Sequence, residues 1–215
     1  MMRNFKIVVE YDGTNYCGWQ RQENGVSIQQ VLEEAIGLIT GGEKITVIGS
    51  GRTDAGVHAL NQVAHFKSCT RLPVNNIYRG VNSVLPPDIV VKEMEETKDD
   101  FHALRDVKSK IYIYKICNQG LRPALGRNYF WHVRFPLDLE QMKKAAELLI
   151  GTHDFSCFCA TGSDVKDRVR TIRDIEIKKC EDELIEVKVE SRGFLKYMVR
   201  NIIGTLVEVG LDKRK

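Results

Sequence analysis

The segment from Gly49 to His58 places three side chains that can do chemistry close together, namely Arg52, Asp54 and His58. Three glycines in this segment let the chain turn tightly and bring its backbone close to a ligand. An ionised aspartate can attack an anomeric carbon as a nucleophile. Paired acid–base hydrolysis is not indicated, because Asp54 is the one carboxylate of the segment. The alternative is a structural Asp54, since aspartates beside glycines commonly bind turn amides.

The composition is that of an ordinary globular protein, with 43% hydrophobic and 28% charged residues in 215. A chain of this length forms one large domain or two small ones. Its longest apolar runs are far shorter than a membrane span. The N-terminus begins an alternating pattern and lacks the apolar core of a signal peptide. We therefore expect a cytoplasmic protein without a membrane partner.

The six cysteines indicate neither a disulfide framework nor a zinc site, because they are dispersed and no C-x-x-C pair occurs. Cys157 and Cys159, near His153 and Asp154, are the one place to consider a metal. Alternation in residues 155–159 more simply predicts a strand with both cysteines on one face. We expect no metal.

Positive charge is concentrated in one part of the chain, although the net charge is only +3. From Arg105 to Arg134 there are seven Lys or Arg and one acidic residue. Aromatic residues are interleaved with these cations, among them Tyr112, Tyr114, Tyr129 and Trp131. This mixture suits phosphate contacts with base stacking. The alternative is a solvated strand surface.

Hydrophobic periodicity predicts the elements that position the glycine-rich segment. Ser27 has the form of a helix N-cap with Gln30 three residues on, and an apolar helical stripe follows until Gly41. Strands are predicted at 5–11, 45–50, 62–67 and 89–95, with a second helix at 74–83. The first half thus has the order βαββαβ.

The second half begins the same order again near residue 106. Strands are predicted at 109–117, 129–133, 171–179 and 183–191, a helix around 139–150, and a last helix carrying Leu195 to Leu206. This predicts an α+β protein of two ferredoxin-like units, 1–105 with the glycine-rich segment and 106–215, which form an extended, mostly antiparallel sheet with helices on one face. The pattern stops after the last helix, so we expect the second unit to lack its final strand.

The stretch from Gly51 to Ala59 resembles the signature of the TruA family of tRNA pseudouridine synthases. Further matches follow in order: Tyr11-Asp12-Gly13, Gly18-Trp19-Gln20, Gln62 to Phe66, Leu85 to Ile89, Phe101-His102-Ala103, Gly151 to Phe155, Phe194-Leu195 and Met198 to Thr205. The resemblance extends to about Gly210 and implies that the chain lacks the family's C-terminal segment.

The resemblance implies a role for individual residues. Asp54 matches the catalytic aspartate that acts on the target uridine, and Arg200 the arginine that pairs with this carboxylate. Tyr112 matches the tyrosine that stacks on the flipped uracil. Arg52 matches the signature arginine that contacts RNA, and His58 is expected to be a further RNA contact.

The resemblance also implies an activity and partners. We expect a homodimer that isomerises uridine to pseudouridine at positions 38, 39 and 40 of tRNA without a cofactor. The segment Gly18 to Arg21 is expected to bind tRNA by hydrogen bonds or stacking. Two alternatives are a non-catalytic RNA-binding module of RRM-like fold and a carboxylate-dependent hydrolase. The hydrolase lacks a second acid, and a binding module has no use for the lone carboxylate of the signature.

Overall fold

The computed structural model describes residues 1–162 and 165–214. The chain divides into two compact units, Met1–Val107 and Lys108–Lys215, close to the expected boundary between residues 105 and 106. The hydrogen-bonded strands form two sheets, one in each unit, where the sequence suggested a single extended one. Within the described ranges, no helix is long and apolar enough to cross a membrane.

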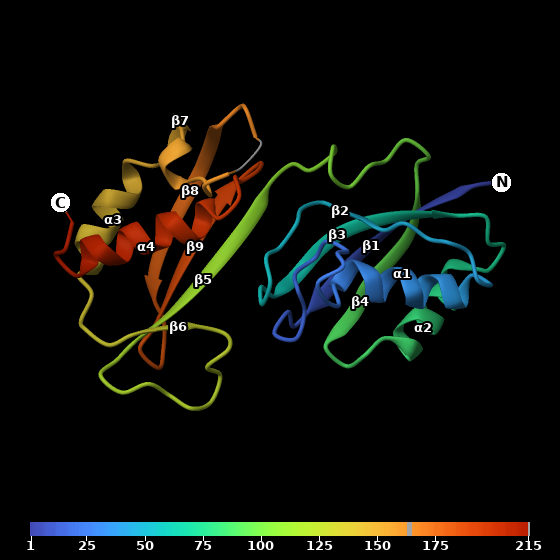
Figure 1. The fold of residues 1–215 in the computed structure, drawn as a ribbon, viewed down its shortest axis with the longest axis horizontal. Helices are drawn as coiled ribbons and strands as arrows, with labels where there is room; N and C mark the ends of the chain where they lie inside the picture. The colour runs from blue at the N-terminus through green and yellow to red at the C-terminus, as the bar shows by residue number, and fades with distance from the viewer. Residues whose placement is uncertain (163–164, 215) are drawn as a thin grey trace. The chain divides into compact units, whose positions relative to one another are not determined.

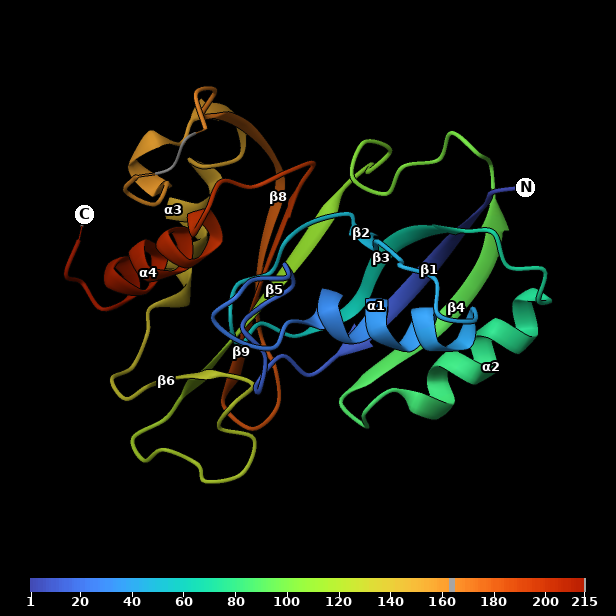
Figure 2. The ribbon, with the colours of Figure 1, turned by 45° about the vertical axis from the view of Figure 1, so that its right-hand side comes forward.

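The first unit contains a four-stranded antiparallel sheet in the order β2-β3-β1-β4. Its elements are β1 (Arg3–Tyr11), α1 (Ile28–Ile39), β2 (Ile48–Gly49), β3 (Ala59–Ser68), α2 (Val74–Val84) and β4 (Ile89–Thr97). Both helices lie on the same face of the sheet (Figures 1 and 2). This is the order of a ferredoxin-like βαββαβ unit, as the sequence predicted.

Alternation along β1 creates the core of this unit. Phe5, Ile7 and Val9 are fully buried, and they pack with Leu32 and Ile36 of α1. The helix begins where expected, because the Ser27 hydroxyl accepts a hydrogen bond from the amide of Gln30 at 3.3 Å. One apolar helix stripe thus meets one apolar sheet face.

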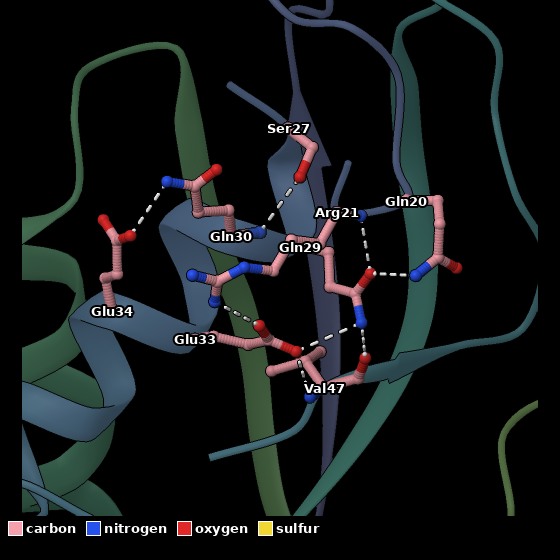
Figure 3. Close-up of polar contacts among 8 residues, drawn as sticks. All are labelled: Gln20, Arg21, Ser27, Gln29, Gln30, Glu33, Glu34 and Val47. Carbon is pink, nitrogen blue, oxygen red and sulfur yellow. Dashed lines mark hydrogen bonds and ion pairs between the residues drawn. The ribbon is translucent and has the colours of Figure 1, made fainter. Parts of the chain in front are cut away.

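The strand expected at 45–50 is reduced to two residues, because side chains of α1 take the backbone groups of Val47. The Val47 amide donates to Glu33 Oε1 at 3.0 Å, and its carbonyl accepts from Gln29 Nε2 at 2.9 Å. Gln29 Oε1 also accepts from Gln20 Nε2 and from the Arg21 amide (Figure 3). This network fixes the chain on both sides of α1 and positions β2 beside β3.

The second unit has a five-stranded sheet in the order β6-β5-β9-β8-β7. Its elements are β5 (Lys110–Asn118), β6 (Trp131–Val133), α3 (Leu139–Glu147), β7 (Gly151–Asp154), the 3-10 helix η1 (Ser156–Phe158), β8 (Val169–Lys179), β9 (Leu184–Ser191) and α4 (Met198–Gly210). The two long helices run side by side (Figure 1). Met142 and Ala146 of α3 join Ile202 and Leu206 of α4 in a core over the sheet.

The second unit departs from the first at its edge strand. In the first unit β4 flanks β1, whereas here the short β6 pairs in parallel with β5. No strand follows α4 among the residues described up to 214. Strand β7 was not predicted, and the strand expected around Cys157 and Cys159 was wrong. That segment turns instead as η1, where Asp154 Oδ1 caps the Ser156 amide at 2.8 Å.

Candidate active site

The glycine-rich segment forms a loop, residues 50–58, between β2 and β3. Its first residue is tied to β3, because the Ser50 amide donates to the Val63 carbonyl at 2.8 Å. At its tip the Val57 amide donates to the Asp54 carbonyl at 3.2 Å and closes a turn. Asp54 is partly exposed and Arg52 is exposed. The loop therefore presents a carboxylate and a guanidinium from a short, hydrogen-bonded turn.

The segment that follows β1 holds this loop in place by hydrogen bonds. The Trp19 amide donates to the Thr53 carbonyl at 3.0 Å, and the Gly56 amide donates to the Tyr16 carbonyl at 3.3 Å. The hydroxyls of Tyr11 and Thr53 are 2.9 Å apart. Tyr11 is only 2% exposed, so this hydrogen bond anchors the residue before Asp54 in the core.

Two glycines allow this close approach between the two segments. A Cβ atom at Gly13 would lie 2.1 Å from the Val57 carbonyl oxygen, and one at Gly18 would lie 2.5 Å from that of Thr53. Gly18 also has a φ of +91°, which side chains rarely adopt. Both positions therefore require glycine so that the loop around Asp54 can sit directly on the backbone beneath it.

His58 ends the loop and contacts the same segment. Its Nδ1 is 2.9 Å from Asp12 Oδ1 and 3.1 Å from the amide nitrogen of Gly13. A protonated Nδ1 donates to Asp12, whereas an unprotonated Nδ1 accepts from Gly13, so the tautomer decides between the contacts. Asp12 is held in turn by the amide and hydroxyl of Thr14. His58 thus fastens the loop as well as lying on it.

The expectation of stacking against tRNA was wrong for Trp19. Its side chain is 2% exposed and lies against Gly49, where a Cβ atom would come within 2.6 Å of the indole. The motif residue therefore packs under the loop. Nearby, burial raises the pKa of Tyr16, and a hydrogen bond of 2.6 Å to Asp88 raises it further. Sequence reasoning found these motifs but not their supporting role, because close backbone contact leaves no signal in one sequence.

Tyr112 belongs to the second unit, on β5 opposite Val189 of β9. It is half-buried, and its ring meets that of Phe194 edge-on at 5.0 Å between centroids. Lys110 lies two residues earlier on the same side of the strand, and burial lowers the pKa of its ammonium group. Strand alternation thus places Lys110, one of the cations between Arg105 and Arg134, beside Tyr112.

Arg200 lies in the first turn of α4, six residues beyond Phe194 in the chain. It is exposed, whereas Met198, Val199 and Ile202 are buried. Its guanidinium lies over the ring of Tyr197, 5.4 Å from the centroid. Tyr197 caps the helix in a left-handed conformation with φ of 61°. Arg200 thus lies beside the buried, apolar side of α4, with an aromatic ring supporting the cation.

The predicted site residues are therefore distributed over both units. Arg52, Asp54 and His58 share one loop of the first unit, while Tyr112 and Arg200 lie in the second unit near the segment 194–200. Within the described part of the chain, no group of three or more His, Cys, Asp or Glu residues is arranged to hold a metal ion.

Comparisons with known proteins agree with one another. Residues 7–104 and 145–215 match the model of a family described as tRNA pseudouridine synthase. The tRNA pseudouridine synthase A of Thermoanaerobacter sp. strain X514 is 52% identical over 214 residues, which cover 100% of this chain and 87% of the relative. Its counterparts from Acetivibrio thermocellus and Clostridium acetobutylicum are 47% and 48% identical over 99% of this chain and 86% of each relative. The chain belongs to the tRNA pseudouridine synthase family.

Proposed function

We propose that this protein converts uridine to pseudouridine in tRNA and that Asp54 is its catalytic carboxylate. The observation that carries the assignment is the fastened loop: its backbone is anchored on residues 11–19 while Asp54 stays partly exposed. A nucleophile benefits from such a fixed and accessible position. Membership of the family supports the reaction and the substrate.

The reaction exchanges one glycosidic bond for another. The bond from C1′ to N1 of uracil breaks, the base rotates, a bond from C1′ to C5 forms, C5 loses its proton and N1 gains one. Asp54 attacks the sugar at C1′ or the base at C6, or it assists the elimination. Because the exchange involves no net oxidation or reduction, the proposal requires no cofactor and no metal.

Four further residues have proposed roles in this site. Tyr112 stacks on the uracil after the base leaves its helix, a step that every enzyme working on a base within a duplex must make. Arg200 pairs with Asp54 and orients the carboxylate. Arg52 contacts the RNA from the loop, and His58 does so with the exposed part of its ring.

The proposed substrate sites are positions 38, 39 and 40, in the anticodon stem-loop of the tRNA. The proposed assembly is a homodimer that binds tRNA in the cytoplasm, where mature tRNA is used. Light scattering on the purified protein, with and without tRNA, tests the dimer independently of catalysis.

Asp54→Asn tests the catalytic assignment, and Asp99→Asn is its matched control because Asp99 is an exposed aspartate of the same unit. We expect Asp54→Asn to abolish the formation of pseudouridine in unmodified tRNA, measured by mass spectrometry. The Kd for tRNA should stay within about threefold of wild type, a smaller change in binding free energy than the 1.4 kcal/mol of a tenfold change. Asp99→Asn should retain both properties. Wild-type protein that binds tRNA but forms no product would favour the RNA-binding module, and product formation by Asp54→Asn would remove Asp54 from the chemistry.

A further inference from the structure

We call residues 119–135 the cationic loop; they comprise the connection between β5 and β6, the short strand β6 and the two residues that follow it (Figure 1). From Val107 to Leu137 the chain carries six cations and no acidic residue: Lys108, Lys110, Lys115, Arg122, Arg127 and Arg134. The three arginines belong to the cationic loop and all are exposed. No ion pair to any of these three is found in the part of the chain that the structure describes. Their charge is therefore open to an external anion.

Large apolar side chains in the cationic loop are also exposed to solvent. Leu121 and Leu125 are 84% and 88% exposed, and Phe135 and Trp131 are 61% and 40% exposed. Solvent contact of this extent on neighbouring apolar groups indicates a binding surface. The guanidinium of Arg134 lies 5.8 Å from the centre of the Phe135 ring, so cation and aromatic group are presented together.

The base of the cationic loop is fixed by hydrogen bonds. Asn118 Nδ2 donates to the carbonyls of Val133 and Phe135 at 2.9 and 2.8 Å, and Asn118 Oδ1 accepts from the Leu137 amide at 3.1 Å. Trp131 is held edge-on to Tyr114, with 6.4 Å between ring centroids. A partner thus meets a surface that is already ordered, which lowers the entropic cost of binding.

We propose that the cationic loop is an RNA-docking surface, on which Arg122, Arg127 and Arg134 contact phosphates and Trp131 stacks on an unpaired base. Arginine guanidinium groups beside aromatic rings recognise single-stranded RNA in this way. The proposal rests on the proposed function and adds a contact of the substrate tRNA outside the nucleotide that reacts.

A second copy of this chain is the competing occupant, and its acidic surface argues against it. Two of the three acidic side chains of β4 are already paired, Glu95 with Lys6 and Glu96 with Arg3, each at 2.7 Å. Because these carboxylates are already neutralised within the unit, RNA phosphate is the better counter-charge. Light scattering in the test below decides between the two occupants.

The first experiment removes the charge. The triple variant Arg122→Gln, Arg127→Gln, Arg134→Gln is compared with Lys44→Gln, Arg71→Gln, Arg79→Gln, which removes the same charge from exposed cations of the first unit. The Kd for tRNA is measured between 50 and 200 mM salt. Loss of three phosphate contacts makes the negative slope of log K against log salt shallower by about 2 to 3. The ratio of the variant's Kd to the wild-type Kd should therefore shrink about 15- to 60-fold between 50 and 200 mM salt. The control should keep the wild-type slope.

The second experiment uses Trp131 as its own reporter. The chain has two tryptophans, and Trp19 is only 2% exposed. Quenching of fluorescence by acrylamide therefore reports mainly on Trp131. We expect saturating tRNA to protect this tryptophan, and Trp131→Phe to remove the effect. Circular dichroism of each variant verifies that it is folded.

The outcomes separate this proposal from the proposed function. Unchanged tRNA affinity and salt slope in the arginine variant overturn the RNA-docking surface, even when the variant still forms pseudouridine at saturating tRNA. A variant that loses self-association but keeps its tRNA slope assigns the cationic loop to a second copy instead. If the arginine variant has a shallower salt slope but the wild-type protein forms no pseudouridine, the RNA-docking surface is supported and the proposed activity is contradicted.

Discussion

Gly18→Ala is the substitution that most directly tests whether the loop around Asp54 must be held in one place. Gly18 lies under this loop with a φ of +91°, and a Cβ atom there would approach the Thr53 carbonyl oxygen to 2.5 Å. The same oxygen accepts the hydrogen bond from the Trp19 amide at 3.0 Å. An alanine methyl group therefore displaces the residue immediately before Asp54.

The magnitude follows from two separate costs. A left-handed backbone costs a residue with a Cβ atom about 1–2 kcal/mol. The overlap with backbone, which has no flexible end that could move aside, costs about 1–3 kcal/mol more. A displacement on the order of 1 Å at a reacting group lowers the rate by about 100-fold. We therefore expect Gly18→Ala to lower kcat by about two orders of magnitude, with a Kd for tRNA close to that of wild type.

Gly42→Ala is the matched control. Gly42 has nearly the same φ, +86°, but nothing lies within 4 Å of its Cβ position. It should lose about 1–2 kcal/mol of unfolding free energy and keep its kcat. Single-turnover pseudouridine formation at saturating tRNA, together with urea unfolding, measures both quantities. The reasoning is refuted if the two variants have equal kcat values, or if the loss in Gly18→Ala matches its unfolded fraction.

Two further predictions concern the structure that carries the loop. Gln29→Leu should cost about 2–4 kcal/mol of unfolding free energy, because it leaves the Val47 carbonyl and other buried groups without partners. Gln30→Leu on the same helix should change the unfolding free energy by less than about 0.5 kcal/mol, because its amide group makes a solvent-exposed hydrogen bond, to Glu34 (Figure 3). Burial lowers the pKa of His65 in the folded chain below its ordinary value of 6.5. As the pH drops below 6.5, His65 therefore becomes protonated in the unfolded chain but not in the folded chain, and the free energy of unfolding decreases. The free energy of unfolding, measured from pH 7.5 to 5.5, should decrease more steeply for wild type than for His65→Gln, and equal slopes would contradict the assignment.

The elements that depend on local pattern were predictable from the sequence. Period-two alternation gave β1, and a capping residue followed by an apolar stripe gave α1. The strand before the loop was overestimated, since the backbone of Val47 is satisfied by side chains that are distant in sequence. No local pattern reveals which polar group such a side chain will choose. The parallel pairing of β6 depends likewise on a contact that short segments cannot specify.

The candidate site divides in the same way. The types of Arg52, Asp54 and His58 and their placement on one loop follow from the sequence. Their support does not, because Gly13 and Gly18 act through the absence of a side chain against backbone that lies about forty residues away in the chain. A glycine in a motif indicates tight backbone, but only the fold identifies the neighbour.

Trp19 shows why this distinction matters for function. An aromatic residue in a motif of an RNA-modifying enzyme suggests a stacking role, yet Trp19 is buried under the loop. Trp131, which lies outside the matched motifs, is exposed within the cationic loop. Burial therefore separates the two tryptophans: Trp19 supports the loop around Asp54, and Trp131 is accessible at the surface. It follows that replacing Trp19 should affect kcat through the position of Asp54, whereas replacing Trp131 should affect tRNA affinity and leave the reacting geometry intact.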